Sequence, residues 1–393
     1  MFETSQIELS LSALKKNIRF LKRLLPTNTV FSSVIKGNAY GHGISLIVPM
    51  AEQCGIRHFS VFSADEARKA KRSKTAQSQI MIMGAIDNDE LAWAIERDIS
   101  FYVFEMDRLR AAQKTAKGLG KKARIHMEIE TGMNRLGFQS TAVKKALSFI
   151  MQNHEHLTLE GVCTHYAGSE SIDNYLRIQN QIQHFNEQCI ELASQGVDFK
   201  TRGTIRHTAC SAAALTYPNT VMDMVRIGIA QYGFWPSKET EIQFFLRKKS
   251  GRRRSKTIDP LIRVIKWKSA VMSTKRIKRG DYVGYGSSSL ITRPARIASV
   301  PIGYADGFFR ALSNKGYVLV RGKPAPVAGM VNMNMLMIDV TDIKGVRKGD
   351  EVVIIGKQGD NTISVGAFGE LTRFINYELL VGLPSEIPRK VVN

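Results

Sequence analysis

A lysine stands at the end of a short β-branched run, directly before a glycine-rich turn. The run covers 29–36 and ends in Lys36, and the segment Gly37 to Gly43 that follows contains three glycines. Lysine is rarely buried without a role, and a desolvated amine at the end of a buried strand can form a Schiff base. The spacing fits equally well a lysine whose stem lies on apolar surface while its amine reaches water.

A second segment alternates charged and apolar side chains with the period of a β-strand. Its charged positions are Arg124, His126, Glu128 and Glu130. If this face points into a barrel, its charges need partners, and Arg135 is the obvious cation. For the segment in isolation, an exposed edge strand with one wet face is the simpler interpretation.

The cysteines indicate neither a metal site nor a disulfide framework. The chain has four, at positions 54, 163, 189 and 210, and no two form a C-x-x-C pair. We expect reduced thiols and no metal.

Eight strand-like runs are expected to position these residues. They cover 29–36, 58–62, 79–83, 100–104, 123–130, 159–165, 204–210 and 222–227. Helical patterns separate most of them, and the clearest ends at Gly196 and carries on one face Ile178, Ile182, Phe185, Cys189 and Leu192. A further helix is predicted over 10–26, with Ser10 as its N-cap and Pro26 as its stop. This alternation predicts a (β/α)8 barrel, whose strands open at their carboxyl ends onto an active-site face.

After Trp235 the pattern changes to short alternating runs. Turn dipeptides separate them: Gly280-Asp281, Arg321-Gly322 and Gly349-Asp350. This pattern is typical of all-β structure. We therefore expect a barrel domain over 1–240 and a mostly β domain over 241–393, with the boundary near Pro236 to Lys256.

The chain is strongly basic. It has 56 Lys and Arg against 35 Asp and Glu, a net charge of +21, and part of the excess lies in one run: Arg247, Lys248, Lys249, Arg252, Arg253, Arg254 and Lys256. Such a run could bind nucleic acid or an anionic membrane surface. It has no aromatic residue to stack on bases and is interrupted by Ser250 and Gly251, so we favour a solvated linker.

No segment has the composition of a membrane span or a secretory leader. A span needs roughly 18 to 20 consecutive apolar residues, and a leader needs a basic segment followed by an apolar one. We expect a cytoplasmic protein.

Lys36 begins the sequence K-G-N-A-Y-G-H-G, which resembles the cofactor-lysine signature of alanine racemases. Other segments resemble motifs of the same family, in the family's order. They are ETGMNRLG at 130–137, THYA at 164–167, SAA at 211–213, RIGIAQYG at 226–233, VGYG at 283–286, GYADG at 303–307 and INYE at 375–378. The resemblance spans nearly the whole chain and implies the same architecture, a (β/α)8 barrel followed by a mostly β domain.

The resemblance implies a pyridoxal-phosphate-dependent racemase that interconverts L- and D-alanine and supplies D-alanine for peptidoglycan precursors. Racemisation needs two groups facing opposite sides of the α-carbon. By resemblance these are Lys36 and, from the second subunit of a homodimer, Tyr285. Because the unperturbed pKa of tyrosine is about 10, a cation must favour its phenolate, and His165 and Arg226 resemble the family residues that link it toward the cofactor. Arg226 is also the implied partner of the pyridine nitrogen, to which a guanidinium does not readily give up a proton, and this should limit transamination.

Other positions are implied to bind the cofactor and the substrate. The phosphate positions are Tyr40, Ser211, Gly228 and Ile229. Arg135 is implied to face the cofactor's phenolic oxygen. The implied substrate positions are Arg135, Met333 and Tyr304.

The chain departs from the family pattern at several positions. Glu128 stands where many members carry a carbamylated lysine, and we expect its carboxylate to orient Arg135 in the same way. Ser385 stands in place of a tyrosine that narrows the substrate pocket. Toward the entrance, Met330 and Asn334 replace arginine and aspartate. These changes leave open a broader specificity, including serine or larger amino acids.

Three other classes of function remain as alternatives. A fold-related decarboxylase would show a different glycine-rich phosphate loop and C-terminal signature. A non-catalytic pyridoxal-phosphate carrier would lack the β domain that carries Tyr285. Nucleic-acid binding, which we consider unlikely, rests only on the net charge.

Overall fold

The computed structural model describes residues 3–249, 258–372 and 375–393. It divides into two compact units. We call Leu14–Ala39 with Ile44–Ile262 the barrel unit, and Met1–Ala13, Tyr40–Gly43 and Arg263–Asn393 the β unit. Residues 3–13 therefore group with the C-terminal part of the chain, and residues 241–249 and 258–262 group with the barrel.

The barrel unit contains an eight-stranded parallel sheet in the described part of the chain, in the order β8-β7-β6-β5-β4-β3-β2-β9. The strands are β2 Val30–Val34, β3 His58–Ser63, β4 Gln79–Ala85, β5 Ser100–Val103, β6 Ala123–Glu128, β7 Leu157–Cys163, β8 Ile205–His207 and β9 Met224–Ile227. Backbone N–H groups of Asp223 and Arg226 donate to the carbonyls of Arg206 and Ala209, at 3.1 and 2.9 Å, and so join β9 to the β8 side. The predicted strands and the predicted barrel are confirmed.

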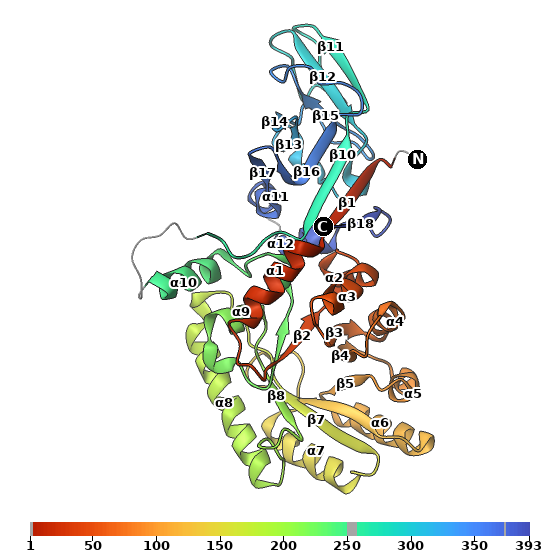
Figure 1. Ribbon diagram of the computed structural model, residues 1–393, viewed down its shortest axis with the longest axis vertical. Coiled ribbons are helices and arrows are strands. Elements are labelled where there is room, and N and C mark those ends of the chain that lie inside the picture. Colours follow the sequence, from red (N-terminus) through yellow and green to blue (C-terminus); the bar gives the residue numbers. More distant parts are fainter. Residues whose placement is uncertain (1–2, 250–257, 373–374) are drawn as a thin grey trace. The chain divides into compact units, whose positions relative to one another are not determined.

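Helices lie outside the strands (Figure 1). They are α1 Leu11–Lys22, α3 Ile44–Gln53, α4 Ala64–Ser73, α5 Leu91–Glu96, α6 Met106–Leu119, α7 Ser140–Gln152, α8 Tyr175–Ser194, α9 Ser211–Thr216 and α10 Lys238–Lys249. Helix α8 buries all the apolar positions predicted for it, so its period and its inner face are confirmed. Ser10 caps α1, because its Oγ accepts the N–H of Ala13 at 3.2 Å.

The charged face of β6 points into the barrel. The side chain of His126 reaches that of His207 on β8, two strands away, and Glu128 is only 5% exposed. The wet edge strand is therefore the wrong interpretation. Arg124 has a partner that the sequence did not indicate, Glu160 of β7, with 2.5 Å between Nε and Oε1.

The β unit is built on two antiparallel-rich sheets with two short helices. One sheet has the order β14-β13-β16-β10-β1-β18, with β17 on β16, and the other has the order β11-β12-β15. The elements are β1 Ser5–Ser10, β10 Ile265–Ala270, β11 Ser273–Ile277, β12 Ala295–Val300, β13 Tyr317–Val320, β14 Lys323–Pro326, β15 Leu336–Asp339, β16 Glu351–Gln358, β17 Asn361–Ile363, β18 Arg389–Val392, α11 Val365–Thr372 and α12 Asn376–Val381. Arg321 and Gly322 form the predicted turn between β13 and β14, both with positive φ, as a two-residue hairpin loop requires.

Part of the expected linker is helical. Helix α10 covers Lys238–Lys249, and the ring of Phe244 packs against Phe20 and Trp235 at centroid distances of 5.7 and 5.2 Å. Aromatic burial on the barrel thus overrides the polar composition of this segment. The remainder of the basic run, in 250–257, lies outside the described residues. Among the helices that are described, none is long and apolar enough to cross a membrane.

Candidate active site

Lys36 follows β2 by two residues, at the carboxyl end of the barrel strands. The residue as a whole is exposed to solvent, although protein atoms pack around its amine. Burial of the amine, and after it the positive charge of Arg135, lowers the pKa of Lys36 below its usual value. A lowered pKa leaves more of the amine neutral, which is the form that acts as a nucleophile or base.

The chain after Lys36 makes one left-handed turn. The φ angles of Gly37, Asn38, Ala39 and Tyr40 are 62°, 51°, 56° and 51°. For residues other than glycine this conformation costs roughly 1–2 kcal/mol each. Side-chain bonds hold it, because Glu66 Oε1 accepts the N–H of Asn38 at 3.2 Å and Asn38 Oδ1 accepts the N–H of Ile44 at 3.1 Å. Strain of this kind is typical of functional sites, which makes Lys36 a candidate functional residue.

Arg226, on β9, is buried and is 4% exposed. Nη1 donates to Nδ1 and to the carbonyl of His207, each at 2.6 Å. Nη2 donates to the carbonyls of Thr164 and Thr208 at 2.8 and 3.1 Å. These bonds use all four terminal N–H groups, so in the described chain Nε–H is the guanidinium donor left for a bound molecule.

His165 follows β7 and is half-buried. Burial lowers the pKa of His165 to about 3, and the nearby charges of Arg226 and Arg135 act in the same direction. The imidazole is therefore neutral near pH 7. Of the two candidate cations, His165 and Arg226, only Arg226 is therefore charged at this pH.

Ser211 and Gly228 form one end of a polar cradle. Ser211 Oγ accepts the backbone N–H groups of Gly228 and Ala230 at 3.0 and 3.5 Å. The hydroxyl hydrogen of Ser211 remains to donate, which suits a bound anion. Ile229, the third predicted residue here, is fully buried.

Glu128 Oε2 is buried and accepts no hydrogen bond within the described chain. Burial raises the pKa of Glu128, and the charges of Arg226 and Arg135 act in the opposite direction. Arg135 is exposed, and its backbone N–H donates to Glu130 Oε2 at 3.3 Å. Over the described residues, no hydrogen bond joins the side chains of Glu128 and Arg135, so the orienting role of Glu128 stays a prediction.

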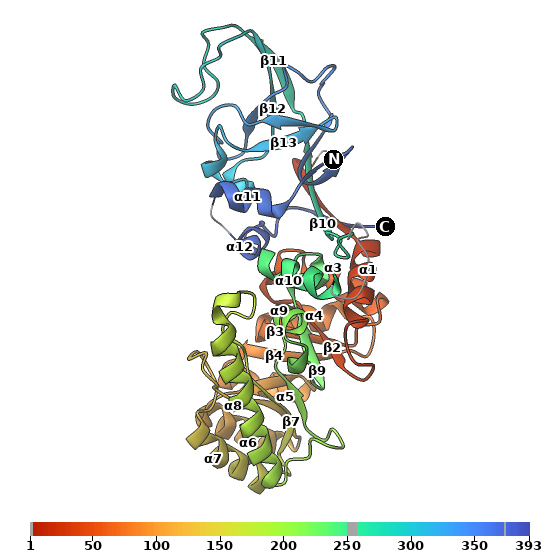
Figure 2. The same ribbon diagram turned by 90° about the vertical axis from the view of Figure 1, so that its left-hand side faces the viewer.

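The β unit holds the remaining predicted residues. Tyr285 is 74% exposed in the connection between β11 and β12, which extends away from the strands (Figure 2). With Asn332 it lines a hollow of about 570 Å³. Tyr304 and Met333 lie together, because the N–H groups of Tyr304 and Ala305 donate to the carbonyls of residues 332 and 333, each at 3.0 Å. Both side chains are exposed.

Tyr40 also belongs to the β unit, as do Ser385, Met330 and Asn334, three of the residues that depart from the family pattern. Tyr40 is buried, and its ring centroid lies 5.9 Å from that of Tyr377. Ser385 is exposed and donates to Glu386 Oε1 at 2.8 Å. Met330 is half-buried and Asn334 exposed.

The sequence did not indicate the buried polar residues that extend from Arg226 into the barrel interior. His207, at the end of β8, and Glu160, in β7, are the most important of these. Each lies in a predicted strand, but their contacts run across the barrel, and no local pattern indicates them.

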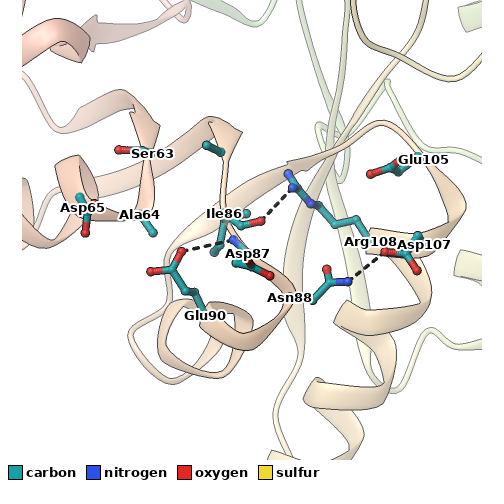
Figure 3. Close-up of a pocket in the computed structure, with 11 residues that line it drawn as sticks. Ser63, Ala64, Asp65, Ile86, Asp87, Asn88, Glu90, Glu105, Asp107 and Arg108 are labelled. Atoms are coloured by element: carbon teal, nitrogen blue, oxygen red, sulfur yellow. Dashed lines mark hydrogen bonds between the residues drawn. The ribbon is translucent and has the colours of Figure 1, made fainter.

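Another hollow, of about 460 Å³, opens where β3, β4 and β5 end (Figure 3). Five carboxylate residues line it: Asp65, Asp87, Glu90, Glu105 and Asp107. Asn88 Nδ2 donates to Asp107 at 2.9 Å, and Arg108 points across the hollow to the carbonyl of Ile86, at 2.8 Å. In the described parts of the chain, no His, Cys, Asp and Glu side chains group closely enough to hold a metal ion.

The barrel residues fit pyridoxal phosphate. Lys36 offers an amine of lowered pKa, and Arg226 offers a spare, buried donor of the kind that a pyridine nitrogen accepts. Ser211, whose Oγ accepts the Gly228 N–H, keeps its hydroxyl hydrogen to donate to a phosphate.

Comparisons with known proteins identify the family of the chain. Residues 9–236 match the family model of the alanine racemase N-terminal domain and residues 264–391 that of the C-terminal domain. The chain is 35% identical to an alanine racemase of Leptospira interrogans, covering 99% of this chain and 96% of that protein. A crystal structure of alanine racemase from Bacillus anthracis with bound L-Ala-P matches with a TM-score of 0.87 and 30% identity, covering 100% of this chain and 96% of that one. The structure from Streptomyces lavendulae matches with a TM-score of 0.88 and 27% identity, covering 100% and 98%. The chain belongs to the alanine racemase family.

Proposed function

We propose that this protein is a pyridoxal-phosphate-dependent racemase that interconverts L- and D-alanine, with Lys36 and Tyr285 as its two bases. The observation that carries the proposal is the Lys36 amine, of lowered pKa, at the barrel end where Arg226 keeps one donor unused. Family membership over the whole chain supports the same reaction.

Lys36 would hold the cofactor through its amine and serve one face of the substrate's α-carbon. When bound, pyridoxal phosphate stabilises the carbanion that remains after the α-proton leaves. Ser211 and the backbone near Gly228 would bind the phosphate. Arg226 would donate Nε–H to the pyridine nitrogen without protonating it, because a guanidinium keeps its proton. This arrangement favours return of the proton to the α-carbon over transamination.

Tyr285 would serve the opposite face, from the second subunit of a homodimer. Its high exposure supports this role, since a side chain donated to a partner stands free of its own unit. Arg226 is the cation available to favour the phenolate, because His165 is neutral near pH 7. Tyr40 would reach the phosphate, Arg135 the phenolic oxygen of the cofactor, and Tyr304 and Met333 would line the substrate entrance.

A racemisation assay tests the activity. Purified protein loaded with pyridoxal phosphate is given single-enantiomer amino acids, and chiral chromatography follows the products. L- and D-alanine should each yield a mixture of both enantiomers. Release of an amine and carbon dioxide would instead favour the fold-related decarboxylase, and faster turnover of serine would favour the broad-specificity alternative.

Mixing two inactive variants tests the shared site. Lys36→Ala and Tyr285→Phe should each be inactive as homodimers. If each site takes Tyr285 from the partner, half of the randomly mixed dimers carry one intact site, and about a quarter of the wild-type activity returns. No recovery, in mixtures shown to exchange subunits, would place both residues in one chain's site. We also propose a cytoplasmic location, which fractionation of cells would check.

A further inference from the structure

Two buried histidines and a glutamate extend from Arg226 through the barrel interior. His207 Nδ1 lies 2.6 Å from Arg226 Nη1, and His207 Nε2 lies 2.9 Å from His126 Nδ1. His126 Nε2 lies 3.6 Å from Glu160 Oε2, a little beyond a hydrogen bond, and makes no other polar contact in the described chain. Both imidazoles are essentially inaccessible to solvent. The catalytic roles proposed above use none of these three side chains.

Donor chemistry fixes the direction of this chain. A guanidinium only donates, so His207 Nδ1 must present its lone pair to Arg226. Burial lowers the pKa of His207 and of His126, so each ring is neutral and carries one proton. His207 therefore carries its proton on Nε2 and donates it to His126 Nδ1. By the same logic His126 carries its proton on Nε2, which points to Glu160.

The backbone of β7 is shaped to admit this arrangement. The register between β6 and β7 shifts after Ile125, so that His126 pairs with Gly161 and Glu160 is left as the extra residue of a bulge. Bulges change the direction of side chains, and here the bulge directs Glu160 toward Arg124 and His126 of β6. A Cβ at Gly161 would lie 2.2 Å from His126 Nδ1, so only glycine leaves room for the imidazole pair.

We propose that Glu160, acting through His126 and His207, is a positioning residue that fixes one tautomer of both histidines and thereby holds the guanidinium of Arg226 with Nε–H directed at the cofactor ring. Arg124 holds Glu160 in turn, with 2.5 Å between Nε and Oε1. The inference rests on the proposed function only for what Arg226 faces. The tautomer order depends on this chain alone.

The first test reads the tautomers directly. Cofactor-free protein labelled with ¹⁵N in its histidine rings is studied by NMR at pH 7. Both buried rings should be neutral, with the hydrogen on Nε2. A ring of His207 that is protonated on Nδ1, or on both nitrogens, would overturn the proposal without any variant being made.

Variants then test the influence of Glu160 on the cofactor. Glu160→Leu removes the acceptor and should weaken pyridoxal phosphate binding to the cofactor-free protein, measured by titration, by about tenfold or more, the usual effect of losing a hydrogen bond to a charged group. It should also leave the His126 and His207 rings as mixtures of tautomers. Glu160→Gln keeps an acceptor oxygen and should recover part of the cofactor affinity and part of the tautomer order.

Glu90→Leu is the matched control, since Glu90 also pairs with an arginine of the barrel unit, at 2.7 Å from Arg68 Nη1. It should leave affinity and tautomers unchanged. Folded Glu160→Leu protein with wild-type ring signals and affinity would refute the proposal. If wild-type protein failed to racemise alanine, the proposed function would fall, while the NMR result would still decide the tautomer order.

Discussion

At the scale of single residues, the carboxyl group of Glu128 is a buried group of the barrel whose hydrogen bonding is incomplete in the described chain. It is buried, its Oε2 has no partner in the described chain, and two arginines act on it through their charge alone. Such a group is costly to ionise in the folded protein and is kept only where it has a use. We expect that use to be the orientation of Arg135 once the cofactor is bound.

Glu128→Gln should make the protein more stable and less active. Burial raises the pKa of Glu128 above its ordinary value of 4.5. The unfolded chain therefore ionises first as pH rises through 4.5, which lowers wild-type stability from there upward. The unfolding free energy of the variant should exceed that of wild type above this pH and match it below. Turnover should fall on the order of tenfold, the effect of losing one charged hydrogen bond. Equal kinetics in the two proteins would remove the role assigned to Glu128.

Ser385→Tyr should narrow the substrate range. Ser385 is small and exposed, and its hydroxyl bonds only to the neighbouring Glu386 among the described residues. A pocket wider by one side chain discriminates by roughly 1–3 kcal/mol per methylene. The ratio of kcat/KM for alanine to that for serine should therefore rise in the variant. An unchanged profile over a panel of amino acids would show that position 385 does not set specificity.

Residue types and their order along the chain predict Lys36, Arg226 and Ser211 as members of one site, and the structure places all three in the barrel unit, in or just after its strands. They did not predict Glu160 or His207. Those residues matter because strands β6, β7 and β8 bring them together across the barrel, through a register shift that no local pattern encodes.

At the scale of elements, the sequence predicted all eight barrel strands, because buried β-branched runs and amphipathic helices alternate there with clear periods. It did not assign β1, whose alternating pattern says nothing about its partners. It also missed α10, whose Phe244 packs against Trp235 although the composition of the segment is mostly polar.

Gly41→Ala should disrupt the segment after the left-handed turn. Gly41 has a φ of +75°, and a Cβ there would lie 1.8 Å from the carbonyl oxygen of Leu380. Gly120 is the matched control, because its φ is +61° and nothing lies within 4 Å of the added Cβ. Gly120→Ala should cost about 1 kcal/mol, the usual conformational penalty, and Gly41→Ala several kcal/mol more, because a backbone carbonyl must move. Chemical denaturation measures the unfolding free energy of both variants. Equal losses would mean that the backbone near Leu380 moves away from the added Cβ at little cost.

At the scale of the whole molecule, the buried histidines make stability depend on pH. Burial lowers the pKa of His58 to about 3 and lowers those of His126 and His207 as well. These rings stay neutral in the folded chain and take up protons on unfolding below pH 6.5, their ordinary pKa. The contribution of these rings to the unfolding free energy should be fully present above pH 6.5 and should fall toward pH 3. Each ring lowers the unfolding free energy by up to about 1.4 kcal/mol for each pH unit of that fall.

Urea denaturation between pH 4 and 7.5 measures this slope. His58→Asn should make it shallower, because it removes one ring that is neutral in the folded chain and protonated in the unfolded chain. An unaltered slope in the His58 variant would show that its ring titrates alike in the folded and unfolded chains.

The β unit draws on both ends of the chain. Strand β1 lies between β10 and β18 and pairs in parallel with β18. Ile7, in β1, is fully buried. Ile7→Ala should cost about 2–5 kcal/mol. The loss should appear in hydrogen exchange as faster exchange in β10 and β18, with the barrel strands unaffected. Faster exchange spread evenly over both units would contradict this division.

Translation order gives this pairing a cost. On the ribosome, β1 emerges first, and the entire barrel is made before β10 and β18 exist to flank it. Until then the nascent chain carries a strand with two unpaired edges and with Ile7 and Leu9 not yet buried, a state open to holdase chaperones and to aggregation.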